Sequence, residues 1–142
     1  MIVYFDTSAL FKLYVSEPGS AEVQAVRRKA AMSATVLVTY AEVQAAFARR
    51  IREQPAIAPS LRLDQKDFVA DWTNWAVIGM NQTLMLQAAY LADAFALRGY
   101  DSIQLAAAAY TQQQSQTTVT FACFDERLNK AASLLGMTAV FQ

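Results

Sequence analysis

Short strand-forming runs that each lead into a helical segment are the feature that most constrains this chain of 142 residues. The first run, residues 2–5, reads Ile-Val-Tyr-Phe, and Asp6 ends it just before a helical pattern at residues 9–15. A continuous apolar run of this kind is typical of a strand that is buried on both faces. Strands that alternate with helices predict an α/β fold with a largely parallel sheet, because each helix carries the chain back across the sheet.

The same order of strand and helix continues along the rest of the chain. Breaks at residues 17–20 and 54–60 carry proline or glycine and separate the segments. Further strands are predicted at residues 35–39, 76–78, 118–124 and 138–141, and further helices at residues 21–31, 40–53, 61–75, 82–96, 102–113 and 126–135. We therefore expect one α/β domain over residues 1–142, with a mostly parallel central sheet of four to five short strands flanked by helices.

Two absences limit the chemistry of the chain. It has no histidine, which excludes Ser-His and Cys-His nucleophile pairs and proton transfer through imidazole. Its one cysteine, Cys123, allows neither an internal disulfide nor a Cys/His zinc site. If the chain is a hydrolase, its machinery is therefore carboxylates, acting alone or through a hard metal ion bound by oxygen atoms.

Charge and hydropathy indicate which partners and which cellular compartment suit this chain. The formal net charge is zero, which argues against a protein that coats nucleic acid through bulk positive charge. Local basic runs remain at residues 27–29 and 49–52. No apolar run reaches the ~18 residues that a membrane span needs, and the first residues lack the basic start of a signal peptide. We therefore expect a cytoplasmic protein without membrane contact.

Acidic residues stand close to the ends of predicted strands. Asp6 ends the first strand, Glu42 lies in the first helical turn after the second, and Asp125 follows the strand at residues 118–124. Sites in open α/β sheets form beyond the carboxyl ends of the strands. Carboxylates gathered there repel each other, and Mg²⁺ or Mn²⁺ relieves that repulsion because both ions prefer carboxylate and water oxygens. Such an ion can activate water against a phosphodiester.

Each acid also stands where a helix favours one, so an ordinary capping role remains open. Asp6 and Asp125 are candidate N-caps, and Asp101 can cap the helix that follows it. Thr39 and Glu42 have the spacing of a capping box. One acid can serve both roles, because helix N-termini stabilise anions. Spacing alone does not show that the acids converge.

Side chains near these acids are candidates for supporting roles. Ser8 and Thr7, which follow Asp6, can orient a ligand carboxylate or satisfy helix N–H groups. Arg98 stands three residues before Asp101 and can bind phosphate or hold that acid in a salt bridge. Both readings stay open for each of these residues.

Aromatic side chains on predicted helices offer possible contact surfaces. Trp72 and Trp75 can stack on bases, although a core position is commoner for such a pair. Apolar residues make up 55% of the chain, so some helix surfaces are expected to form a dimer face or a groove for a partner. The candidates for that surface are Phe11, Tyr14, Phe47 and Trp72.

Four segments, in order along the chain, resemble the VapC-type toxins of the PIN-domain family. They are residues 2–19, with Asp6-Thr7-Ser8 and the Glu17-Pro18-Gly19 break, residues 40–43, residues 97–106 and residues 121–128. The resemblance implies a PIN fold and an Mg²⁺-dependent (or Mn²⁺-dependent) endoribonuclease that acts on RNA. It implies that the catalytic metal ligands are Asp6, Glu42, Asp101 and Asp125. It also implies a homodimer, the toxin of a type II toxin–antitoxin pair, that a small antitoxin protein neutralises.

The chain departs from this family pattern at two positions. The family often has histidine where Gln104 stands, and this change leaves all four acids in place. The family often has threonine or serine where Cys123 stands. That change removes a hydroxyl near Asp125, so we expect the geometry around this acid, or the metal affinity, to differ.

Two other functions remain open at this point. A catalytically silent PIN-like binding module would act only through its partner protein, and the presence of all four acids argues against it. An acid-dependent phosphatase would use Asp6 as its nucleophile. Phosphatases of the haloacid-dehalogenase kind carry a second aspartate two residues further on, where this chain has Ser8.

Overall fold

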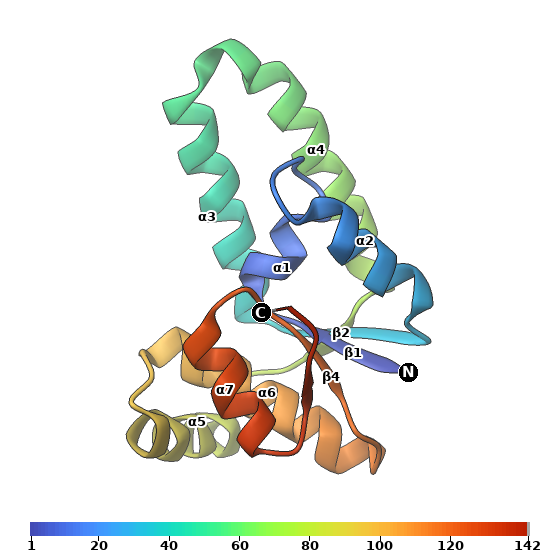
Figure 1. Ribbon diagram of the computed structural model, residues 1–142. Coiled ribbons are helices and arrows are strands. Elements are labelled where there is room, and N and C mark those ends of the chain that lie inside the picture. Colours follow the sequence, from blue (N-terminus) through green and yellow to red (C-terminus); the bar gives the residue numbers. More distant parts are fainter. Residues whose placement is uncertain (142) are drawn as a thin grey trace.

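The computed structural model describes residues 1–141 as five parallel strands between two layers of helices (Figure 1). The strands, in the spatial order β3-β2-β1-β4-β5, are β1 (Ile2–Phe5), β2 (Met32–Val36), β3 (Ala76–Ile78), β4 (Thr120–Ala122) and β5 (Thr138–Ala139). The helices are α1 (Thr7–Phe11), α2 (Ser20–Lys29), α3 (Val38–Glu53), α4 (Ala58–Asp71), α5 (Gln82–Phe95), α6 (Gly99–Ser115) and α7 (Glu126–Leu134), with 3₁₀ helices η1 (Pro55–Ile57) and η2 (Trp72–Asn74). The predicted α/β class and mostly parallel sheet are confirmed.

β1 lies at the centre of the sheet, and its side chains alternate between the two layers. Val3 and Phe5 pack against α1 to α4, while Tyr4 packs against α5 to α7. All three side chains are fully buried. Tyr4 is paired with Phe121 of β4 in the parallel register. A strand covered on both faces needs a continuous apolar run, which the first residues of the chain supply.

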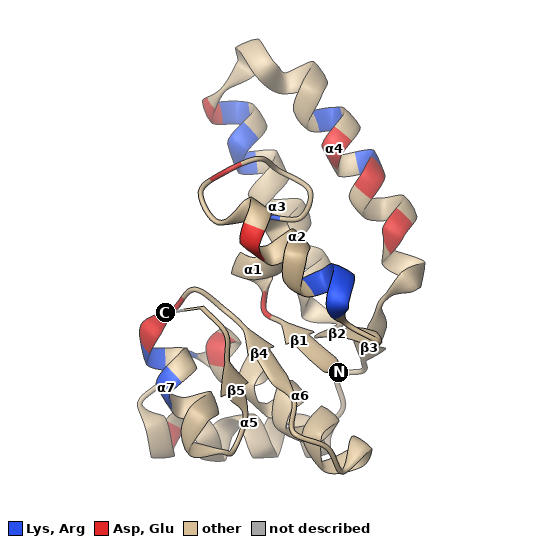
Figure 2. Ribbon diagram, turned by 45° about the vertical axis from the view of Figure 1, so that its right-hand side comes forward, with Lys and Arg blue, Asp and Glu red and all other residues tan. Residues whose placement is uncertain are grey.

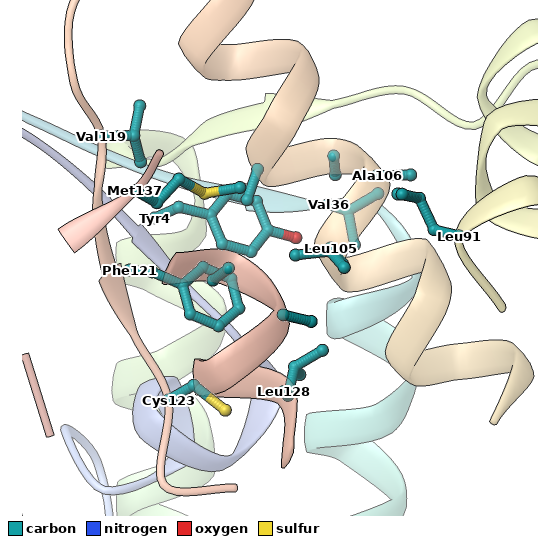
Figure 3. Close-up of a cluster of buried hydrophobic side chains, with 14 of the residues drawn as sticks. Tyr4, Val36, Leu91, Leu105, Ala106, Val119, Phe121, Cys123, Leu128 and Met137 are labelled. Carbon is teal, nitrogen blue, oxygen red and sulfur yellow. The ribbon is translucent and has the colours of Figure 1, made fainter. Parts of the chain in front are cut away.

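The core between the sheet and α5 to α7 is drawn in Figure 3. The ring of Tyr4 stacks on that of Phe121, with ring centroids 5.9 Å apart. Val36, Leu105 and Leu128 pack around this pair. Burying a side chain of this size contributes roughly 1.5–3 kcal/mol. The core therefore anchors α6 and α7 to the strands that they follow.

The opposite core, between the sheet and α1 to α4, corrects one expectation from the sequence. Phe11 and Phe47 are 7% and 0% exposed, so the expectation that they form a partner surface is wrong. The faces of α1 and α3 that carry them point into the molecule. Tyr14 and Trp72 are half-buried against the same core. Trp75 is buried with them, so it is a core residue and not a platform for bases.

The boundary between β2 and α3 also differs from its prediction. β2 ends at Val36 and α3 begins at Val38, so the strand predicted at residues 35–39 is shifted towards the N-terminus. Its β-branched residues favour a strand locally. Leu37 nevertheless has a helical backbone conformation (φ −54°, ψ −39°), and its N–H donates to the carbonyl of Ile78. This bond is the last one between β2 and β3, and the strand ends earlier than local preference predicts.

The other elements lie within a few residues of their predicted positions. α1 covers Thr7–Phe11 instead of residues 9–15, and β4 covers Thr120–Ala122 instead of residues 118–124. No helix within residues 1–141 is both long and apolar enough to cross a membrane.

Candidate functional site

The predicted acids gather at the edge of the sheet where β1 and β4 end. Asp6 follows β1 directly, and its N–H extends the ladder by donating to the carbonyl of Ala122 (3.1 Å). Asp125 precedes α7, three residues after β4, and Asp101 lies in the first turn of α6. Figure 2 shows acidic segments just beyond β1 and at the start of α7. Parallel strands end at one edge, so residues distant in sequence meet there.

Asp6 is a buried carboxylate that caps α1. Its Oδ1 accepts hydrogen bonds from the Ala9 N–H (2.9 Å) and the Ser8 hydroxyl (2.7 Å), so the predicted capping role is confirmed. The residue is 6% exposed, and no lysine or arginine within residues 1–141 pairs with it. Burial raises the pKa of Asp6, bonds from Ala9, Cys123 and Ser8 oppose that rise, and the charge of Asp101 adds to it. This carboxylate lacks a compensating cation.

Asp101 and Asp125 line one cavity of about 650 Å³. Burial and the charge of Asp125 raise the pKa of Asp101, while Arg98 lowers it. The Arg98 side chain is 91% exposed and 3.9 Å from Asp101, so this ion pair is weak. Asp125 caps α7 by accepting from the Leu128 N–H (3.0 Å), as predicted. The two acids therefore face the same solvent-filled space.

The capping role predicted for Asp101 is wrong. α6 begins at Gly99, so Asp101 is inside the first turn, and the N-cap is Arg98 without a side-chain bond. An acid at this position still favours the positive end of the helix dipole. Its carboxylate does not cap the helix and instead lines the cavity.

The capping box predicted for Thr39 and Glu42 is also wrong. α3 starts one residue before Thr39, with Leu37 as an N-cap that makes no side-chain bond. The Oε1 of Glu42 accepts instead from the Thr7 hydroxyl (2.6 Å) and from the Gln104 side-chain amide (3.1 Å). Because Thr7 follows Asp6 directly, Glu42 is brought to the same edge of the sheet.

Cys123 lies between two of the acids. Its Sγ accepts from the Asp125 N–H (3.2 Å), and the residue is fully buried. Burial and the nearby charge of Asp6 raise the pKa of the Cys123 thiol well above its ordinary value, so the thiol stays protonated. Ser8, Thr7 and Cys123 therefore all contact one of the acids, as a supporting role requires.

The acids influence one another in pairs without forming a closed cage. Asp101 raises the pKa of Asp6, and Asp125 raises that of Asp101. In the part of the chain that the structure describes, no three His, Cys, Asp or Glu side chains lie close enough to hold a metal ion together. The donors are oxygens, and Mg²⁺ is usually bound by one or two carboxylates plus several waters. The donor set therefore fits a hydrated Mg²⁺ or Mn²⁺ ion.

Two cations of the cavity were missed by sequence reasoning. Arg127 and Lys130 lie in α7 and line the cavity together with Arg98 and three acids, which are Asp101, Asp125 and Glu126. Their spacing of three residues, just after Asp125, is the signal that marks one helix face. Three cations of the basic runs that the sequence did single out are engaged elsewhere, because ion pairs join Arg27 to Asp71, Arg49 to Glu53 and Arg50 to Glu17.

Comparison with known proteins decides the family. Over 135 residues the chain is 30% identical to "Ribonuclease VapC45" of Mycobacterium tuberculosis strain CDC 1551 / Oshkosh, covering 95% of this chain and 92% of that protein. This chain belongs to the VapC ribonuclease family. "Ribonuclease VapC49" of strain ATCC 25618 / H37Rv matches with the same identity and coverage. No protein-family model matches the chain.

Two solved structures share the VapC-like fold. A toxin–antitoxin complex from Klebsiella pneumoniae aligns with a TM-score of 0.56 and 21% identity, covering 83% of each chain. The crystal structure of PAE2754 from Pyrobaculum aerophilum aligns with a TM-score of 0.53 and 20% identity, covering 96% of each chain. These likenesses confirm the PIN-like fold.

Proposed function

We propose that this chain is an endoribonuclease that hydrolyses RNA phosphodiesters with Mg²⁺ or Mn²⁺ and serves as the toxin of a toxin–antitoxin pair. Membership of the VapC ribonuclease family supports the reaction. The observation that carries the proposal is the shared cavity, where Asp101 and Asp125 lie beside the cations Arg98, Arg127 and Lys130. A phosphodiester needs both elements, because cations bind its charge and carboxylates bind the activating ion.

The four acids would form the metal-binding site. Asp6, Asp101 and Asp125 would hold one or two hydrated ions, directly or through bound water, and Glu42 would complete the site or position water. When bound, the ion supplies positive charge beside the phosphodiester and makes a nearby water molecule more acidic. The bonds that Ser8 and the Ala9 N–H make to Asp6 hold that carboxylate in one orientation.

The basic side chains of the cavity would bind the RNA backbone. Arg127 and Lys130 lie on the same helix, three residues apart, and Arg98 approaches from the start of α6. Contacts of this kind are independent of sequence and position the strand. Because the acids Asp101, Asp125 and Glu126 also line the cavity, these cations would bind a phosphate most favourably when a metal ion offsets the acidic charge.

The proposed protein partner is supported by the family and by one solved structure of similar fold. The Klebsiella pneumoniae structure is a toxin–antitoxin complex, which supports a small antitoxin protein as the partner of this chain. We further propose that the chain is a homodimer and acts in the cytoplasm.

A cleavage assay with removal of the metal tests this function. A 5′-labelled RNA is incubated with pure protein in Mg²⁺, in Mn²⁺ and in EDTA, beside an Asp101→Asn variant purified in the same way. We expect cleavage only by the unaltered protein with a divalent ion. Cleavage by the variant, or in EDTA, would show that another activity is present and contradict the assignment.

The same assay addresses a second candidate, the catalytically silent binding module. That candidate is favoured by the absence, in residues 1–141, of three acids close enough to hold an ion. It predicts that neither metal supports cleavage and that the unaltered protein and Asp101→Asn bind the antitoxin equally well. Cleavage that depends on Mg²⁺ or Mn²⁺ rules it out.

A further inference from the structure

The side chain of Gln104 is a buried amide that connects the core to the candidate site. It is 3% exposed and lies in α6, one helical turn after Asp101. Its Oε1 accepts from the Tyr4 hydroxyl (2.7 Å). Its Nε2 lies within hydrogen-bond distance of the oxygens of Glu42 (3.1 Å), Thr7 (3.1 Å) and Thr39 (3.0 Å). Residues 4, 42 and 104 thus form a polar path through β1, α6 and α3.

The chemistry of the partners decides which way this amide faces. A carboxylate can only accept hydrogen bonds, so the Glu42 end of the path requires the nitrogen of Gln104. The oxygen is then left for Tyr4, which must donate. A phenol has an ordinary pKa of about 10, so the Tyr4 hydroxyl carries its proton at neutral pH and donates to Gln104.

Tyr4 is itself held firmly. Its ring is fully buried and stacked on Phe121, with an angle of 2° between the ring planes. Figure 3 shows its oxygen directed towards the helix that carries Leu105 and Ala106, which is α6. A fixed hydroxyl fixes the amide that it bonds, because turning the amide would place its oxygen against the Glu42 carboxylate.

The bonds at Glu42 all fall on one of its oxygens. Oε1 accepts from both Thr7 and Gln104. Within residues 1–141, Oε2 of Glu42 takes no hydrogen bond from another side chain or from a backbone N–H. One oxygen of this acid is therefore anchored, and the other remains available.

We propose that Gln104 is a positioning residue, oriented by Tyr4, that anchors Oε1 of Glu42 so that Oε2 can serve a cation or a water molecule. This inference rests on the proposed ribonuclease function. It assigns a role to Gln104 and Tyr4, which lie outside the four acids. A core glutamine that only ties α6 to the sheet would make the same contacts but would not change metal affinity when removed.

Two variants and a matched control separate positioning from stability. Gln104→Met removes the amide, and Tyr4→Phe removes only the hydroxyl that orients it. The control is Gln112→Met, because Gln112 lies in the same helix, donates to the Leu135 carbonyl (2.9 Å) and accepts from the Val119 N–H (3.0 Å). All three changes delete buried or part-buried hydrogen bonds, so urea unfolding is measured first and later work uses conditions where each variant is folded.

The decisive readouts are the Mn²⁺ dissociation constant, from calorimetry, and the single-turnover rate of RNA cleavage. We expect Gln104→Met to weaken one or both by about 10–100-fold, the range found for residues that orient metal ligands. Tyr4→Phe should change the same quantity by a smaller factor, and Gln112→Met should leave both unchanged. Equal behaviour of the two glutamine variants would overturn the inference.

A metal-free measurement keeps this test separate from the proposed function. Nuclear magnetic resonance follows the side-chain NH₂ protons of both glutamines without metal or RNA. We expect Tyr4→Phe and Glu42→Gln each to shift the Gln104 signals and to leave those of Gln112 in place. If the unaltered protein neither binds Mn²⁺ nor cleaves RNA, the proposed function fails. Coupled Gln104 signals would then still support the anchoring of Glu42, and uncoupled signals would overturn it.

Discussion

The guanidinium of Arg27 in α2 donates to Oδ2 of Asp71 at the end of α4, and the Tyr14 hydroxyl donates to the same oxygen. The guanidinium also lies 4.5 Å from the ring centroid of Trp75. Partial burial by itself raises the pKa of Asp71, but hydrogen bonds from Arg27, Tyr14 and Asn74 outweigh it and lower the pKa to about 2. Charge thus ties together two helices that cover one face of the sheet.

The ion pair between Arg27 and Asp71 should stabilise the protein at neutral pH and lose this effect in acid. The folded pKa lies below the unfolded value of 3.8, so the stability is complete above that value and is lost as the pH falls towards 2. The Asp71 side chain is 25% exposed, and after allowance for screening we expect a contribution of about 1–2 kcal/mol. Urea unfolding from pH 7 to pH 2.5 should show Asp71→Asn less stable at pH 7 and converging with the unaltered protein in acid.

A matched control for that experiment is Glu53→Gln, which removes the exposed ion pair with Arg49. We expect it to leave the free energy of unfolding at neutral pH nearly unchanged, because solvent screens an exposed ion pair. A constant difference for Asp71→Asn across the whole pH range would mean that the ion pair is not the source of the stability.

Replacing Asp6 with asparagine should abolish cleavage while preserving the fold. Asparagine keeps an oxygen that can accept from the Ala9 N–H, and the change removes a buried charge that has no basic partner. We expect the free energy of unfolding without metal to stay equal or rise, and the cleavage rate to fall by more than about 100-fold. Added Mg²⁺ should raise the melting temperature of the unaltered protein and of Asp67→Asn, a control at an exposed position of α4, but not that of Asp6→Asn.

Arg127 and Lys130 should set the salt dependence of RNA binding. Each phosphate contact on a single strand contributes about 0.7 to the slope of log affinity against log salt. We expect Arg127→Gln and Lys130→Gln each to reduce that slope by about this amount, measured in EDTA with a labelled RNA. The exposed Arg49, which does not line the cavity, provides the control. An equal loss of slope for Arg49→Gln would place the binding surface elsewhere.

A substitution at Phe47 tests whether this residue is part of the core or of a partner surface. It is fully buried, and its ring meets that of Phe11 with centroids 5.1 Å apart. Phe47→Ala should lower the free energy of unfolding by about 3–5 kcal/mol through the cavity that it leaves. Leu63→Ala, at a position that is 63% exposed, should change it by less than about 0.5 kcal/mol. A change of oligomeric state in light scattering, without loss of stability, would instead support a surface role.

The features that the sequence predicted correctly are those that depend on neighbouring residues. The apolar run at residues 2–5 fits only a strand covered on both faces, and Asp6 and Asp125 cap the helices that follow them. Gly19 marks a break because it has φ 95°, and a Cβ there would lie 3.0 Å from the Phe124 ring. Patterns of two to seven residues carry this information, since backbone preferences and caps act over that distance.

The tertiary structure alone decided what the remaining acids do. Glu42 and Asp101 have the spacing of caps, yet Glu42 bonds Thr7 and Gln104 and Asp101 faces a cavity. These partners come from other elements, and only the parallel sheet, which ends its central strands at one edge, brings them together. Whether an acid caps a helix or joins the site depends on both local and long-range contacts. Its spacing along the chain reveals only the local ones. The four-acid metal site therefore remains a prediction.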